Sequence, residues 1–151
     1  MCYRNLIALT RCLTILSRTR VNETSLNAVF AAAEEVLSLL AHQGRRGLAL
    51  EARVELLNLL QSGLRQIQLC INHHADRFPH YGTYGVRLLR SGLQFLIDDY
   101  MPLAVLEEDK DQWQTFLSRT DVAKLDRGLA DFEPADWMNE DNLPPSHWWF
   151  A

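Results

Sequence analysis

The chain has 151 residues, of which 48% are hydrophobic and 23% charged, an ordinary composition for a globular protein. This length is sufficient for one domain with its own core, without disulfides or a structural metal to hold it together. No apolar run is long enough to cross a membrane, because charged residues interrupt every one. We therefore expect a single soluble domain without membrane association.

The net charge of −4 is distributed unevenly along the chain. Residues 1–100 carry 11 basic and 8 acidic side chains, a net charge of +3, whereas residues 101–151 carry 4 basic and 11 acidic ones, a net charge of −7. Proteins that bind nucleic acid present basic patches to the phosphates, so this acidic third argues against direct nucleic-acid binding. It favours a protein partner with a basic surface, including one that itself binds nucleic acid.

The three cysteines, Cys2, Cys12 and Cys70, are odd in number and match no metal-binding or redox spacing. Their number and spacing are typical of reduced thiols in a cytoplasmic protein. Arginine also outnumbers lysine 13 to 2, a bias associated with GC-rich bacterial genomes. We therefore predict a cytoplasmic protein of bacterial origin.

Apolar residues that recur every three or four positions predict amphipathic helices along most of the chain. The four main helices are expected at about residues 3–19, 22–43, 48–76 and 84–101, with shorter helices at 111–118 and 121–132. Gly63 interrupts the longest one, where it costs about 1 kcal/mol relative to alanine and indicates close helix packing. Pro102 should end the fourth helix, and Thr120 or Asp121 should cap the last one.

Only a few residues connect the first three helices, and short connections favour antiparallel neighbours. The sequence therefore predicts an all-α fold, an antiparallel up-down bundle of four main helices with one or two short C-terminal helices. We assign residues 1–133 to this helical domain and residues 134–151 to an acidic, aromatic C-terminal extension.

The segment between the third and fourth helices, residues 70–85, holds three of the five histidines and is called the hinge below. Its weak candidates for metal ligands are His73, Asp76 and His80. They fit no HExxH, paired ExxH or CxxC motif, and the carboxylates of Asp98 and Asp99 lie at the far end of a helix, about 20 Å away. The simpler interpretation is a polar helix end, so we predict no catalytic residue, no metal and no cofactor.

Aromatic and acidic side chains provide the candidate contact surfaces. Tyr81 and Tyr84 either cap the end of the bundle or contact a partner. The tail contributes four large aromatic side chains, which either fold back onto the bundle or dock in another molecule: Trp137, Trp148, Trp149 and Phe150. Acidic side chains nearby in sequence would steer a basic partner: Asp109, Asp111, Asp136, Glu140 and Asp141.

These features favour a non-enzymatic protein–protein interaction module, namely an inhibitor, immunity-type or adaptor protein that acts through an acidic face and an aromatic tail. In overall character the chain resembles small acidic helical proteins of bacteria and mobile elements, such as immunity proteins and phage-encoded inhibitors of host defence. That likeness covers composition and helicity only. One alternative is a metal- or small-ligand-dependent enzyme at the hinge, between His73 and His80. Another is a structural subunit of a larger assembly, such as a homodimer.

Overall fold

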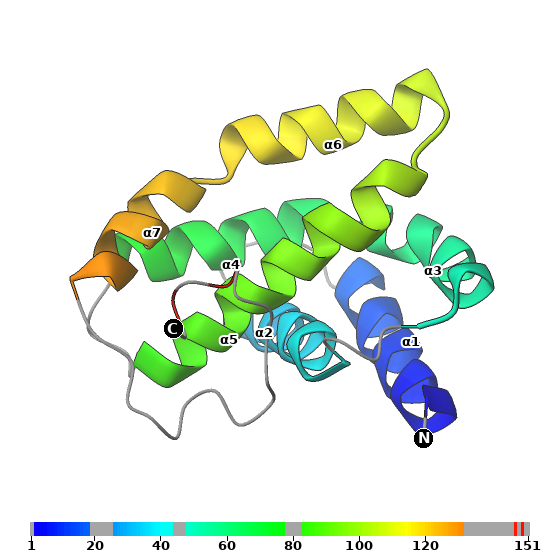
Figure 1. Cartoon of the computed structure of the whole chain (residues 1–151), viewed down its shortest axis with the longest axis horizontal. Coiled ribbons are helices and arrows are strands. Elements are labelled where there is room, and N and C mark those ends of the chain that lie inside the picture. Colours follow the sequence, from blue (N-terminus) through cyan, green and yellow to red (C-terminus); the bar gives the residue numbers. More distant parts are fainter. Residues whose placement is uncertain are drawn as a thin grey trace.

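The computed structural model describes residues 2–18, 26–43, 48–77 and 83–131, together with His147 and Trp149. Within these residues the fold is all-helical and contains no β-strand, as the sequence predicts (Figure 1). None of the helices in this part of the chain combines the length and the apolar character needed to cross a membrane.

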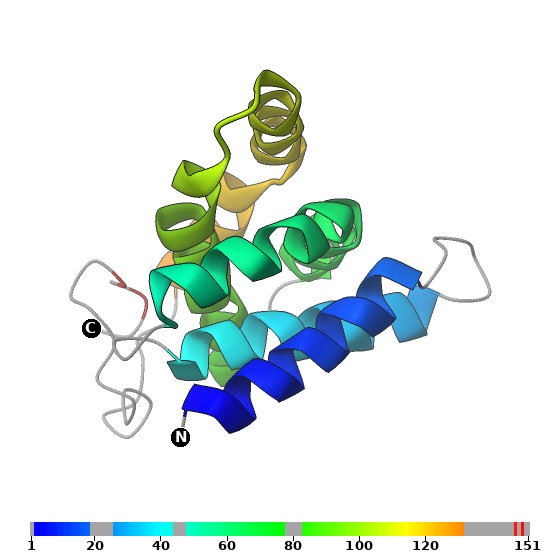
Figure 2. The same ribbon diagram turned by 90° about the vertical axis from the view of Figure 1, so that its right-hand side faces the viewer.

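Helices α1 (Cys2–Arg18) and α2 (Leu26–Gln43) lie side by side and run in opposite directions (Figure 2). The apolar period of both sequences places leucines, valines and alanines on the inward faces of the two helices, where they are buried. Each helix contributes a stripe of such residues: Leu9, Leu13 and Leu16 from α1, and Val29, Ala33, Val36, Leu37 and Leu40 from α2.

The longest predicted helix is divided into two, α3 (Leu50–Ser62) and α4 (Leu64–Arg77), so the expectation of one continuous helix is wrong. The break lies at Gly63, whose backbone has φ −103° and ψ 2°. A Cβ atom at this position would lie 2.8 Å from Cδ2 of Leu16, so the glycine lets α1 pack closely at the bend. Figure 2 shows the resulting change of direction, with α4 nearly end-on while α3 crosses the view. The close packing expected at Gly63 is confirmed.

The second half of the described chain begins with α5 (Thr83–Phe95), which continues into one π-helical turn, η2 (Leu96–Tyr100). A short 3₁₀ turn, η3 (Met101–Leu103), contains Pro102 and ends this helix where the sequence predicts. Helices α6 (Glu107–Arg119) and α7 (Val122–Ala130) follow. The carboxylate of Asp121 caps α7 by accepting a hydrogen bond of 3.1 Å from the amide of Lys124, which confirms one of the two predicted caps.

Helix α6 runs beside α4 in the same direction, because α5, which precedes α6 in the sequence, carries the chain back across the molecule (Figure 1). Two side-chain hydrogen bonds fix the position of α6, one to the last turn of α3 and one to α4. Gln112 donates to the carbonyl oxygen of Gln61 at 2.7 Å, and Asn72 donates to the carbonyl oxygen of Arg119 at 2.9 Å. The up-down order of a regular bundle and the domain boundary at residue 134 stay predictions.

Helix α2 occupies the centre, where it packs against α1, α4 and α5. In its contact with α5, Gly92 lies directly on the backbone of Leu37. A Cβ atom on Gly92 would lie 2.6 Å from the carbonyl carbon and 2.8 Å from the Cα atom of Leu37. Real side chains do not approach a backbone this closely, so the two helices would have to separate to admit even a methyl group.

We predict that Gly92→Ala destabilises the fold by about 3 kcal/mol or more, at or above the upper end of typical overpacking costs. Gly85→Ala is the matched control in the same helix, because a Cβ atom there meets nothing within 4 Å. The control should be neutral, or should stabilise the protein by up to about 1 kcal/mol through helix propensity. Urea denaturation of both variants measures the difference, and equal stabilities would contradict the close crossing.

Candidate functional site

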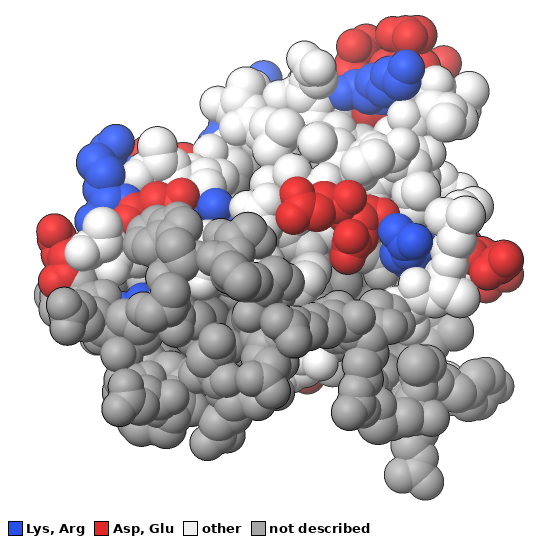
Figure 3. Space-filling view, in the orientation of Figure 1, with Lys and Arg blue, Asp and Glu red and all other residues white. Residues whose placement is uncertain are grey.

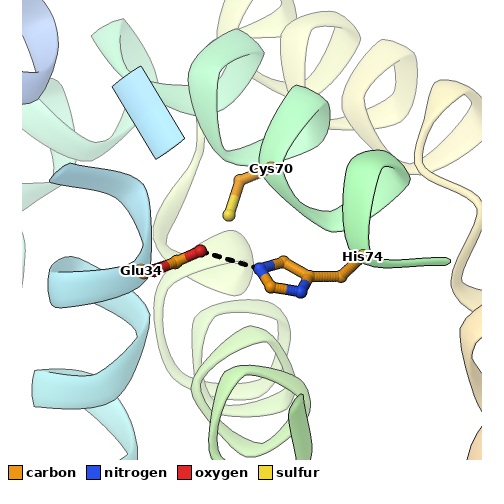
Figure 4. A group of neighbouring side chains, drawn as sticks. All are labelled: Glu34, Cys70 and His74. Atoms are coloured by element: carbon orange, nitrogen blue, oxygen red, sulfur yellow. Dashed lines mark hydrogen bonds and ion pairs between the residues drawn. The ribbon is translucent and has the colours of Figure 1, made fainter. Parts of the chain in front are cut away.

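Three side chains with different chemistry meet between α2 and α4: Glu34, Cys70 and His74 (Figure 4). Cys70 and His74 are four residues apart on α4, so both project from the same face of that helix. Glu34 reaches them from the facing side of α2. One potential ligand atom from each residue lies within 4.8 Å of the others. We call these residues the ECH cluster.

Two polar contacts involve the side chains of the ECH cluster. The Nε2 atom of His74 lies 2.8 Å from Oε1 of Glu34, at the distance of a strong hydrogen bond. The thiol of Cys70 donates a long hydrogen bond to the carbonyl oxygen of Phe30, with 3.9 Å between sulfur and oxygen. Burial, followed by the negative charge of Glu34, raises the pKa of this thiol well above its usual range. The thiol is therefore protonated at neutral pH.

A pocket of about 620 Å³ opens beside the ECH cluster. Glu34 and His74 form part of its wall, and the side chain of Glu34 is 44% exposed. Helix α5 supplies the apolar wall opposite, and two further polar side chains of α2 complete it: Glu35 and Ser38. The carboxylate of Glu34 is therefore accessible to solvent, whereas the imidazole of His74 is only 8% exposed and Cys70 is fully buried.

The arrangement does not match a nucleophilic relay of cysteine, histidine and carboxylate. In such a relay, the imidazole lies between its two partners and contacts them through opposite ring nitrogens. Here Nε2 of His74 faces Glu34, and the Cys70 thiol lies at the same edge of the ring (Figure 4). Instead, the donor atoms of the three residues form a group within 4.8 Å of one another.

The hinge residues proposed from the sequence have other contacts. The ring of His73 stacks on that of Phe30, with 4.5 Å between their centroids. The carboxylate of Asp76 forms an ion pair of 2.6 Å with Lys124 of α7, which lowers the pKa of Asp76. His80 and Tyr81 lie outside the described residues, and only the backbone of Tyr84, in α5, is described.

Sequence reasoning missed the ECH cluster. The spacing of Cys70 and His74 by four residues was visible and indicates a shared helix face. The third member is 36 residues earlier in the chain, and nothing in the local pattern indicates that Glu34 faces them. The sequence alone could therefore not show which of His73, His74 and Cys70 belongs to a site.

On another face of the molecule, His147 and Trp149 lie buried against α5. Ser91 connects the two, because its Oγ atom lies 2.7 Å from Nε1 of Trp149 and 2.9 Å from Nδ1 of His147. Buried Arg87 donates a hydrogen bond to the carbonyl oxygen of Trp149. The indole of Trp149 is only 1% exposed, and its own chain covers it. Its proposed contact with a partner stays a prediction.

Arg90 extends this contact to α7. Its guanidinium forms two hydrogen bonds with the carboxylate of Asp126, at 2.7 and 3.3 Å. The same guanidinium lies over the ring of Trp149, 4.3 Å from the centroid, a cation–π contact. One side chain of α5 therefore holds both α7 and the tryptophan in place.

A third candidate surface lies at the start of α6, where Val105 and Leu106 are 76% and 62% exposed. The acids of the first turns follow at once: Glu107, Glu108, Asp109 and Asp111. We call these six residues the α6 edge. Figure 3 shows acidic side chains gathered at this outer end of the molecule, around a basic one. Lys110 lies 3.8 Å from Glu107 in an exposed pair, which leaves the edge acidic.

The remaining residues proposed as partner contacts lie outside the described part of the chain: Trp137, Trp148, Phe150, Asp136, Glu140 and Asp141. Their roles stay predictions.

No protein-family model matches this chain, and searches of curated proteins and of solved structures found no significant match.

We predict that the free energy of unfolding decreases as the pH falls, in part because of His147. Burial, followed by the charge of Arg90, lowers the pKa of His147 below its ordinary value of 6.5. Above about pH 6.5 the imidazole is neutral in both states, so this stabilising contribution is fully present. Below that pH, the unfolded chain binds the proton first and the contribution is lost. Urea denaturation at several pH values measures the slope.

His147→Gln is the control for this prediction, because glutamine does not titrate. The variant should be less stable at pH 7.5 but should have a smaller pH dependence than the wild type. The pH dependence of the free energy of unfolding that remains in the variant comes in part from His73. The pKa of His73 is also lowered, first by burial and then by the charge of Arg77. An unchanged slope in His147→Gln would contradict the buried position of this imidazole.

Proposed function

We propose that this chain is a non-enzymatic protein-binding module, an inhibitor, immunity-type or adaptor protein of the bacterial cytoplasm. The α6 edge binds a basic surface of the partner. The observation that carries this proposal is the exposed pair Val105 and Leu106, which directly precedes the acidic first turn of α6. Two aliphatic side chains that lie exposed together, with charges around them, have the composition of a small interface core with a polar rim.

The two parts of the α6 edge make different contributions to binding. The aliphatic pair supplies affinity, because apolar surface removed from water contributes about 25 cal/mol per Å². The four carboxylates attract a positively charged surface and accelerate the encounter, an effect that weakens as salt is added. Such a surface repels nucleic acid but suits proteins that bind nucleic acid, whose binding faces are basic.

The packing beneath α6 supports a rigid binding surface. The inner face of α6 is anchored by Trp113 and Phe116, which are buried and meet edge to face with 6.0 Å between their ring centroids. The indole of Trp113 also donates a hydrogen bond of 3.0 Å to the side-chain oxygen of buried Gln61. A surface held in one conformation loses little entropy on binding.

The aromatic tail is the second proposed contact. Trp137, Trp148 and Phe150 would add apolar anchors, with Asp136, Glu140 and Asp141 as further steering charges. A homodimer that buries the α6 edge would instead mark the chain as a structural subunit, and light scattering at micromolar concentration distinguishes the two.

We predict that the double variant Val105→Ser, Leu106→Ser weakens partner binding by about tenfold or more, because hot-spot truncations typically cost more than 1 kcal/mol. The partner is first identified by placing a photo-crosslinking residue at position 106 in the native host. Its affinity for the purified wild type and variants is then measured by calorimetry at low and high salt.

The control is Ile7→Ser, Ile15→Ser on α1, which removes two exposed aliphatic side chains on either side of exposed Arg11. This control should bind like the wild type. Loss of binding in the control, together with full binding by the α6-edge variant, would place the interface on α1 and refute the proposal.

A further inference from the structure

We propose that Glu34, Cys70 and His74 bind a zinc ion, with the adjoining pocket supplying its open coordination position. This site is separate from the protein-binding surface proposed above. The inference rests on the convergence of the three donor atoms, on their chemical types and on the pocket beside them.

The donor types select the metal. A thiolate, an imidazole and a carboxylate together suit Zn²⁺, whereas Mg²⁺ and Ca²⁺ prefer oxygen ligands only. Cys70 and His74 project from one face of α4, and Glu34 faces them from α2, so a bound ion would connect two helices that already pack together.

The distances are close to those that zinc requires. Bonds of about 2.0 to 2.3 Å in a tetrahedral site place the ligand atoms about 3.5 Å from one another. In this structure the three atoms lie within 4.8 Å of one another, so side-chain movements of about 1 Å would complete the geometry. Glu34 has the freedom to make this movement, because its side chain is the exposed member of the ECH cluster.

The pocket explains why three protein ligands suffice. Zinc sites with three protein ligands keep the fourth position for water or another small molecule. The pocket of about 620 Å³ reaches both Glu34 and His74, which allows zinc to enter and leaves room for that fourth ligand. When zinc binds, the Zn–S bond replaces the S–H bond of Cys70, and the thiol proton is released to solvent.

The competing interpretation is purely structural. In that case, the Glu34–His74 hydrogen bond connects two helices, and the Cys70 thiol only contacts the carbonyl oxygen of Phe30. The two interpretations differ in one respect: only a metal site needs all three side chains at once.

The test uses the full chain, purified without a histidine tag and stripped with a chelator. Cobalt(II) replaces zinc in such sites and reports its ligands through its absorption spectrum. We expect one Co²⁺ per chain, a near-ultraviolet charge-transfer band from a thiolate ligand and the visible bands of tetrahedral cobalt. Added Zn²⁺ should abolish the spectrum. If titration with Co²⁺ produces no thiolate band, the proposal is wrong.

Substitutions assign the ligands. Cys70→Ser should remove the charge-transfer band. Glu34→Gln should weaken Co²⁺ binding more strongly than the loss of a residue that only orients a ligand, which typically costs about 10- to 100-fold in affinity. Cys12→Ser and His73→Gln are the matched controls, a second thiol outside the ECH cluster and the neighbouring histidine. Both controls should bind like the wild type. Wild-type affinity in Cys70→Ser, or loss of the band in Cys12→Ser, would overturn the assignment.

Melting temperatures measured with and without zinc distinguish loss of metal binding from misfolding of a variant. Glutamine has the size of glutamate and keeps a hydrogen bond to His74, and position 34 is partly exposed, so Glu34→Gln should fold. Zinc should raise the melting temperature of the wild type and of Cys12→Ser, because binding to the folded state stabilises it. It should not raise that of folded Glu34→Gln, and an equal rise there would refute the role of this carboxylate.

Discussion

The crossing of α5 over α2 at Gly92 brings two helix backbones together without a side chain between them. This contact fixes the position of α2, and α2 in turn contacts α1 and α4. Glu34 lies three residues before Leu37, about one helical turn away, so the same contact determines where its carboxylate faces α4. It also sets the distance between α2 and the part of α5 that closes the pocket. The ECH cluster and its pocket therefore depend on the absence of one methyl group at position 92.

Helices α6 and α7 are attached in a different way. Their apolar side chains supply most of the attraction, since burying a tryptophan or phenylalanine contributes several kcal/mol. Each also forms a polar contact with the body of the protein: a buried one between Trp113 and Gln61, and a part-buried one between Asp126 and Arg90. Such bonds contribute only about 0.5 to 1.5 kcal/mol net, but a buried polar group left unpaired costs about 1 to 3 kcal/mol. These contacts therefore select one register for each helix among those that apolar packing alone would permit.

The sequence determined the local features well. Apolar spacing located the helices, Pro102 ended one of them, Asp121 capped another and Gly63 marked a close contact. The break at Gly63 was missed because a single glycine within a strong helical pattern costs only about 1 kcal/mol, which does not by itself end a helix. The packing of Leu16 against that glycine decides the outcome, and it depends on a helix far away in the sequence.

The candidate sites were harder to predict for the same reason. Val105 and Leu106 are apolar, and a sequence alone does not distinguish an exposed leucine from a buried one in a short connection. The ECH cluster forms only because α2 and α4 are aligned so that Glu34 faces Cys70 and His74. The spacing of residues within one helix does not predict how two helices align. The sequence directed attention to His73, whereas the neighbouring His74 is the histidine that meets Glu34.

The two proposed sites depend on different helices, which lie on either side of the bend at Gly63. The α6 edge is held through Gln61, in the last turn of α3, whereas His74 lies near the C-terminal end of α4, beyond the bend at Gly63. Zinc would connect α4 to α2, and a partner at the α6 edge would contact neither helix at that point. Two routes within the described residues connect the sites: α3 and α4 through the bend at Gly63, and α5, which lines the pocket and leads through η2 and η3 to the α6 edge. Binding at one site should change the geometry of the other only if one of these elements moves.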